Sequence, residues 1–163
     1  MERYLQGEGR SLQKRKIRLT KYLCENEKPD QIINIGYAGS TDIPIGSWVN
    51  ITKSYNNEWC IPGEEKYSFI DYGNQKLDLL DNEKIEKVEC YSSESFVNQT
   101  ELKGHIAFDM ELHSIVVIGD MFNIPVMSLK KISDNLSIDK YYESIQNNNE
   151  VFELESCLKF LQL

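Results

Sequence analysis

The chain has 163 residues, a formal net charge of −8 and an isoelectric point near 4.8. This length suits one domain with one hydrophobic core, so we expect a single domain over residues 1–163. The acidic balance argues against nucleic acid or an anionic membrane as a partner, because both bind basic surfaces.

The start of the chain and its cysteines indicate the cellular compartment. The segment MERYLQGEG (1–9) lacks the apolar core of a secretion signal, and no apolar run is long enough for a membrane helix. The four cysteines form no CxxC pair, so we expect neither a metal site nor a disulfide framework. The sequence therefore predicts a cytoplasmic protein with reduced thiols and no cofactor or metal.

The first half of the chain predicts a helix followed by two strands. Residues 11–26 place apolar residues among charges at helical spacing, which is typical of an exposed amphipathic helix. QIINIG (31–36) has the two-sided apolar character of a buried parallel strand, and IGSWVNITKSY (45–55) predicts a second strand. Residues 56–82 are rich in Tyr, Gly, Asn and charge, and predict a long, partly irregular excursion.

The second half predicts two strands, a helix, a strand and a final helix. The strands are KIEKVECYS (84–92), GHIAFDM (104–110) and IPVMSLKKIS (124–133). The helices cover 111–123 and run from about 138 to the C-terminus, where three asparagines at 147–149 favour an interruption. Because helices and strands alternate, we predict an α/β domain with a mostly parallel or mixed sheet.

Polar residues follow the predicted strands at their carboxyl ends, where ligands of α/β sheets bind. The four ends, GYAGS, SSESF, FDME and ISDN, would bring an aromatic ring and three carboxylates to one edge: Asp109, Glu111 and Asp134. Carboxylates gathered in a half-buried cleft repel one another, so we expect raised pKa values there. A raised pKa suits a general acid near neutral pH.

Four segments in this order resemble the nucleoside phosphorylase/nucleosidase superfamily. They are INIGYAGS (33–40), SESFVN (93–98), FDMELHSI (108–115) and LKKISDN (129–135). GEGR (7–10) is also similar to the GxGK turn that opens a helix in this superfamily. Within the superfamily, the chain is most similar to the methylthioadenosine/S-adenosylhomocysteine nucleosidases.

The resemblance implies a three-layer phosphorylase-like fold, in which helices flank a central mixed sheet. The family's strands before the GxGK turn have no counterpart here, since Met1 stands six residues before Gly7. One of those strands carries a glutamate that activates the attacking water, and neither Glu2 nor Glu8 lies in a matching motif. We therefore expect an N-terminally truncated version of the fold.

The resemblance also implies which residues hold the base. Phe96 would stack on the purine, and the backbone of Val97 would hydrogen-bond its edge. Asp134, in the SD pair with Ser133, would protonate or hydrogen-bond the purine at N7. The similarity to the methylthioadenosine/S-adenosylhomocysteine nucleosidases implies an adenine-type base as the leaving group.

A second set of residues is implied for the sugar. Met110 would pack under the ribose, and Glu111 would accept hydrogen bonds from its 2′- and 3′-hydroxyls. Asp109 is equally compatible with a purely structural role. Tyr37 replaces a serine that helps to hold phosphate in the phosphorylases, with no arginine nearby, and it could fill the space of a 5′-substituent.

These roles predict hydrolysis of the N-glycosidic bond of a purine nucleoside such as methylthioadenosine. An acid at N7 neutralises the leaving base, and a carboxylate near the diol favours the oxocarbenium-like sugar. Two alternatives stay open: a catalytically degenerate nucleoside-binding relative and a purine nucleoside phosphorylase. We further expect a homodimer or larger homo-oligomer.

Overall fold

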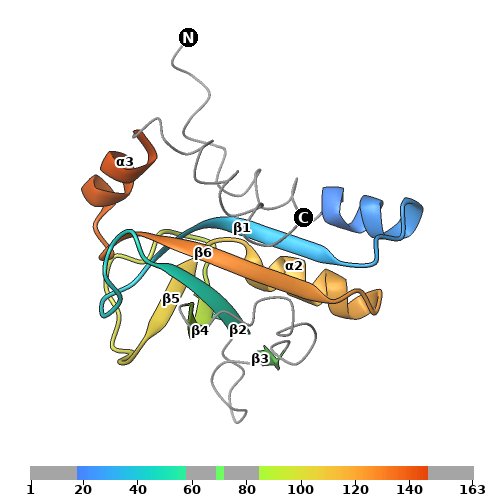
Figure 1. The fold of residues 1–163 in the computed structure, drawn as a ribbon, viewed down its shortest axis with the longest axis horizontal. Helices are drawn as coiled ribbons and strands as arrows, with labels where there is room; N and C mark the ends of the chain where they lie inside the picture. The colour runs from blue at the N-terminus through green and yellow to red at the C-terminus, as the bar shows by residue number, and fades with distance from the viewer. Residues whose placement is uncertain (1–17, 58–68, 72–84, 147–163) are drawn as a thin grey trace.

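The computed structural model describes residues 18–57, 69–71 and 85–146. Residues 18–26 form a helix. The elements that follow are β1 (Ile32–Gly39), β2 (Trp48–Asn56), β3 (Phe69–Asp71), β4 (Glu86–Ser92), β5 (Ile106–Asp109), α2 (Leu112–Met121), β6 (Val126–Asp134) and α3 (Ile138–Gln146) (Figure 1).

The elements predicted within these ranges are present, with shifted ends. β1 continues three residues beyond the predicted 31–36, and α2 begins one residue later than predicted. The strand β3 falls inside the excursion predicted over 56–82, and it was not expected. The GEGR turn, Asn147–Asn149 and most of the 56–82 excursion lie outside the described residues.

The sheet is mixed, as predicted. β1 with β6, β2 with β4, and β4 with β5 are parallel pairs. β1 with β5, β2 with β3, and β2 with β6 are antiparallel. Because β6 pairs with both β1 and β2, the pairings run β2–β4–β5–β1–β6 and return to β2. Strands that are distant in sequence therefore end close together.

The main hydrophobic core lies between α2 and the sheet, where α2 runs behind the strands in Figure 1. The helix contributes Leu112, Ile115 and Val116, which explains the apolar run that follows Glu111. The other members of this core are Ala38, Ile43, Val49, Ile51, Val88, Cys90, Ala107, Val126 and Ile132. Packing of this face holds the start of α2 against the end of β5.

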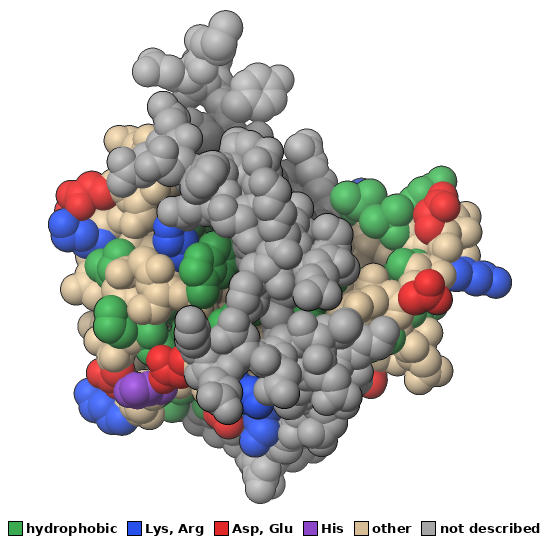
Figure 2. Space-filling view, in the orientation of Figure 1, with side chains coloured by type: hydrophobic (Ala, Val, Ile, Leu, Met, Phe, Trp, Pro, Cys, Tyr) green, Lys and Arg blue, Asp and Glu red, His purple; other side chains and the backbone are tan. Residues whose placement is uncertain are grey.

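The helix at 18–26 packs through Cys24, which contacts the buried Ile118 and Ile124. Its other apolar side chains are exposed, with Leu19 and Tyr22 each at 59%. Figure 2 shows apolar side chains on the surface where this helix lies. The expectation of an exposed helix is therefore confirmed for residues 18–26.

Two of the four cysteines lie among the described residues, and both are unpaired and buried. Burial, reinforced by the nearby charge of Asp109, raises the pKa of the Cys90 thiol, so this thiol stays protonated near neutral pH. Cys60 and Cys157 lie outside the described residues. None of the helices in the described ranges is long and apolar enough to span a bilayer.

Gly119 provides a test of the packing between α2 and β6. A Cβ at this position would lie 2.4 Å from Cγ2 of Val126 and 2.8 Å from the carbonyl oxygen of Ile124. We expect Gly119→Ala to lower the free energy of unfolding by about 1–3 kcal/mol, because overpacking outweighs the better helix propensity of alanine. Urea denaturation measures the change.

The matched control is Asp120→Ala, which alters an exposed residue of the same helix. This change should leave the unfolding free energy within about 0.5 kcal/mol of the wild type. A Gly119→Ala protein as stable as the wild type would show that α2 and β6 are not packed this closely.

Candidate functional site

The carboxyl ends of β1, β4, β5 and β6 meet at one edge of the sheet. Gly39, at the end of β1, lies opposite Phe108 of β5 and Asp134 of β6. Ser92, at the end of β4, lies opposite Asp109 of β5. The strand ends that the sequence singled out therefore come together.

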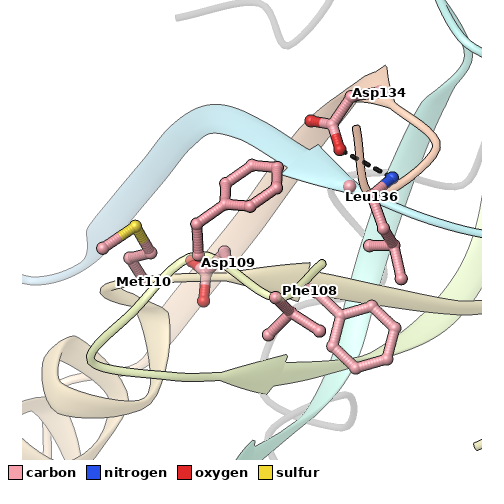
Figure 3. Close-up of a pocket in the computed structure, with 8 residues that line it drawn as sticks. Phe108, Asp109, Met110, Asp134 and Leu136 are labelled. Carbon is pink, nitrogen blue, oxygen red and sulfur yellow. Dashed lines mark hydrogen bonds between the residues drawn. The ribbon is translucent and has the colours of Figure 1, made fainter. Parts of the chain in front are cut away.

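A hollow of about 30 Å³ opens at this edge (Figure 3). Of the predicted site residues, Phe96, Val97, Met110 and Asp134 line it. The remaining described lining residues are Asp109 and three that the site prediction did not include, Gly39, Phe108 and Leu136. The structure thus brings most of the predicted base-binding residues to one place.

Three predicted site residues lie beside the hollow and do not line it. Ser133 is buried directly before Asp134. Glu111 follows Met110 and is half-buried, at the N-cap of α2. Tyr37 is half-buried in β1, two residues before Gly39. A ligand would need to extend beyond the present hollow to reach Glu111 or Tyr37.

Asp134 is 1% exposed and held by two donors. The Ser133 hydroxyl donates to Oδ2 at 2.7 Å. The Leu136 backbone N–H donates to Oδ1 at 2.9 Å, and this bond is the dashed line in Figure 3. Ser133 is also an extra residue in the pairing with β1, where Ala38 lies opposite Ile132 and Gly39 opposite Asp134. A bulge of this kind re-aims the side chain that follows it, here Asp134 toward the hollow.

Gly39 gives the Asp134 carboxylate its space. A Cβ on Gly39 would lie 2.7 Å from Oδ1 of Asp134 and 3.0 Å from Cδ2 of Leu136. Leu136 has a φ of +65°, a left-handed backbone that leucine rarely adopts. The position of the Asp134 carboxylate therefore depends on Gly39, which has no side chain, and on the left-handed backbone of Leu136.

Asp109 forms a buried ion pair with Lys130. The distance from Nζ to Oδ2 is 2.8 Å, and each side chain is 1% exposed. The Asp109 carboxylate also accepts the Ser92 hydroxyl and the Leu112 backbone N–H, the latter at 3.0 Å. Of the roles considered for Asp109, these contacts establish a structural one.

The expectation of a raised pKa is wrong for Asp109. Burial favours a raised pKa, but the Lys130 ammonium and the hydrogen bonds from Ser92 and Leu112 outweigh it, so the pKa is lowered. Burial likewise favours a lower pKa for Lys130, and the Asp109 charge reverses this and raises it. Both groups are therefore ionised near pH 7. Sequence reasoning counted the neighbouring carboxylates and overlooked a lysine on a buried strand.

His113 lies on the first turn of α2, outside the hollow. Its Nδ1 is 3.1 Å from the buried Ser54 hydroxyl, and its backbone N–H donates to the Ser92 hydroxyl at 2.9 Å. Burial lowers the pKa of the His113 ring, so it is neutral near pH 7. Its contacts therefore join the helix start to β2 and β4.

Aromatic rings extend the site beyond the hollow. Phe96 lies 6.0 Å from Tyr141 of α3, measured between ring centroids, in a tilted arrangement. The helix α3 is in turn fixed to β6, because the Ser144 hydroxyl donates to the carbonyl of Ser133. The ring proposed for base stacking thus has a neighbour that restricts its orientation.

No protein-family model matches the chain, and no curated protein matches it. Solved structures do. A 5′-methylthioadenosine/S-adenosylhomocysteine nucleosidase from S. pneumoniae, with a transition-state inhibitor, has a TM-score of 0.71 and 18% identity, over 89% of this chain and 74% of that one. The corresponding nucleosidase from Colwellia psychrerythraea, in complex with adenine, has a TM-score of 0.68 and 16% identity, over 82% and 67%.

Futalosine hydrolase of Helicobacter pylori is also similar, with a TM-score of 0.72 and 18% identity over 92% of this chain and 73% of that one. The chain shares the fold of these nucleosidases and of futalosine hydrolase. The family resemblance read from the four sequence segments is thereby confirmed at the level of the fold. Within this nucleosidase fold, the hollow at the strand ends is the candidate site.

The buried ion pair predicts a specific pattern of stabilities. Asp109→Asn leaves the Lys130 charge buried without its partner, so we expect a loss of about 3–5 kcal/mol in unfolding free energy. Asp109→Asn/Lys130→Met removes both charges and should recover most of that loss. Urea denaturation at pH 7 measures both, with Lys21→Gln, from an exposed pair, as a control that changes little.

The same comparison has a pH signature. The lowered pKa of Asp109 means that its stabilisation is complete above about pH 4 and is lost as pH falls through the folded-state pKa. The raised pKa of Lys130 means that its stabilisation is lost as pH rises above about 10. The unfolding free energy of the wild type should therefore fall relative to that of the double variant both at acidic pH, below about 4, and at alkaline pH, above about 10. A constant difference across this range would contradict the ion pair.

Proposed function

We propose that the chain is a purine nucleoside N-glycosidase that hydrolyses the bond between an adenine-type base and ribose. The observation that carries the proposal is the hollow itself. It brings the buried carboxylate of Asp134, the Phe96 ring and Met110 together in a fold shared with nucleosidases. The adenine complex of one structural neighbour supports the choice of base.

On the base side, Asp134 donates a proton or hydrogen bond to N7 of the purine. The Ser133 hydroxyl orients the carboxyl group through the 2.7 Å bond to Oδ2. Phe96 stacks on the purine, and the Val97 backbone bonds its edge. General acid assistance of this kind is worth about 10²–10⁴-fold in rate, because it neutralises the charge that develops on the leaving base.

On the sugar side, Met110 lies under the ribose and Glu111 accepts hydrogen bonds from the 2′- and 3′-hydroxyls. The negative charge of Glu111 favours the oxocarbenium-like transition state. Tyr37 borders the 5′-substituent. Water is the proposed acceptor in preference to phosphate, because the strand that carries Tyr37 contains no arginine to hold phosphate.

Ligand entry requires the site to open. A hollow of about 30 Å³ holds a water molecule, and a nucleoside is far larger. The side chains of Phe96 and Leu136 line this hollow, so we propose that they move apart when the base enters. The Leu136 N–H bond to Asp134 is then the contact that a purine replaces or reshapes.

One observation favours a second candidate, a nucleoside-binding relative without turnover. Both Asp134 oxygens already accept hydrogen bonds within the protein, from Ser133 and from the Leu136 backbone. A carboxylate satisfied in this way can serve a structural purpose alone. Release of free base from a nucleoside distinguishes the two candidates, and its dependence on phosphate distinguishes hydrolysis from phosphorolysis.

The proposal extends to the whole chain, residues 1–163, as one cytoplasmic domain with helices on both faces of the sheet. We propose that its own side chains carry out the reaction, without a cofactor or metal. We also propose that it forms a homodimer or larger homo-oligomer. The exposed apolar residues of the helix at 18–26, such as Leu19 and Tyr22, support association with another protein surface.

Asp134→Asn tests the proposed acid. We expect wild-type protein to release adenine from methylthioadenosine, adenosylhomocysteine or adenosine, whether or not phosphate is present. Asp134→Asn should abolish this release while nucleoside binding stays within a few-fold, because asparagine keeps the shape and cannot act as the acid. Chromatography of the free base and calorimetric binding provide the two measurements.

The control is Asn135→Ala, since Asn135 is the exposed neighbour of Asp134 and should leave turnover unchanged. Undiminished base release by Asp134→Asn would remove Asp134 from the mechanism. Binding of a nucleoside with no base release by the wild type would favour the second candidate.

A further inference from the structure

We propose that Asp109 and Lys130 are positioning residues that give the site its preference for ribose over deoxyribose. They act through the turn of Met110 and Glu111, which lies between the anchored Asp109 and the first residue of α2. The inference rests on the proposed function, in which Glu111 holds the sugar diol. It assigns a role to Lys130 and to Asp109, which lines the hollow but has no part in the proposed function.

The Asp109 carboxylate fixes the end of the turn that leads into α2. On its helical side, Oδ2 of Asp109 accepts the Leu112 backbone N–H at 3.0 Å. Its Oδ1 accepts the Ser92 hydroxyl, whose oxygen accepts the His113 backbone N–H at 2.9 Å. The first two N–H groups of α2 are therefore held from Asp109, one directly and one through Ser92.

Glu111 stands at the N-cap of α2, yet its side chain makes no capping hydrogen bond. The usual task of an N-cap side chain, holding the first free N–H groups of the helix, passes to Asp109 two residues earlier. The position of the Glu111 backbone thus depends on where the Asp109 carboxylate is held.

Lys130 determines where that carboxylate is held. It comes from β6, on the strand face that also carries the core residues Val126 and Ile132, and its side chain is 1% exposed. Charge-assisted hydrogen bonds are shorter and stronger than neutral ones, and a buried pair is little screened by salt. The end of β5 is therefore fixed to β6 by the 2.8 Å contact.

The same strand carries Asp134, four residues after Lys130. β6 thus positions the base side of the site directly, through Asp134, and the sugar side indirectly, through Lys130 and Asp109. Gly36 on the neighbouring β1 faces the ammonium, because a Cβ there would lie 3.5 Å from Nζ. One strand sets the separation between the proposed acid and the proposed diol ligand.

The test is equilibrium binding of unreactive analogues of adenosine and 2′-deoxyadenosine to the full chain, expressed as the ratio of the two affinities. The variants are Asp109→Asn/Lys130→Met, which removes both charges, and Lys130→Arg, which keeps the cation. Glu111→Gln sets the ratio expected when the diol ligand itself is altered. Lys21→Gln, from the exposed pair with Glu25, is the matched control.

We expect the wild type to prefer the adenosine analogue, and the folded double variant to lose about tenfold of that preference, because small misplacements of a polar ligand group are costly. Lys130→Arg and Lys21→Gln should keep most of it. A double variant that is folded by circular dichroism and keeps the wild-type ratio overturns the inference. Equal losses for both nucleosides also overturn it, since a purely structural role produces them.

Base release from adenosine by the wild type is measured in parallel. If no base is released but the wild type clearly prefers the ribose ligand, the proposed hydrolysis is contradicted. The ratio of the two affinities then still tests the positioning role of Asp109 and Lys130. Normal base release with an unchanged ratio in the double variant contradicts the positioning role and leaves the hydrolysis standing.

Discussion

The ion pair between Asp109 and Lys130 is the constraint on which the candidate site depends. It lies inside the core that α2 forms with the sheet, where a buried charge without a partner would be costly. Each of the two charged side chains therefore needs the other as its partner. Their meeting fixes the end of β5 against β6 and supplies the acceptors for the first turn of α2. Asp109 is thus charged at the edge of an apolar run because its partner lies on another strand.

The site follows from the way the strands end. Parallel pairing of β1 with β6 and of β4 with β5 brings their carboxyl ends to one edge, and the extra residue Ser133 turns Asp134 toward the hollow. Gly39 leaves room for the Asp134 carboxylate, and Leu136 covers it. An acid held beside an aromatic ring, Phe96, is the arrangement that departure of a purine requires.

Sequence reasoning predicted the order of the main elements from their alternation, and four of the eight described lining residues from the motifs of the resemblance. It missed β3, which is only three residues long and depends on its pairing with β2. The bulge at Ser133 and the close approach of Gly39 to Asp134 arise from pairing between distant segments, which no local pattern records. Lys130 did give a signal, since a lysine within a predicted buried strand requires a partner.

The most direct test of the account is a crystal structure of the full chain with an unreactive adenine nucleoside analogue. We expect the base to lie between Phe96 and Asp134, with N7 within hydrogen-bonding distance of the Asp134 carboxyl group and the sugar hydroxyls directed to Glu111. A ligand bound elsewhere would contradict this placement. A bound nucleoside that leaves the hydrogen bond from the Leu136 backbone N–H to Asp134 unchanged, with no contact of its own to Asp134, would contradict it as well.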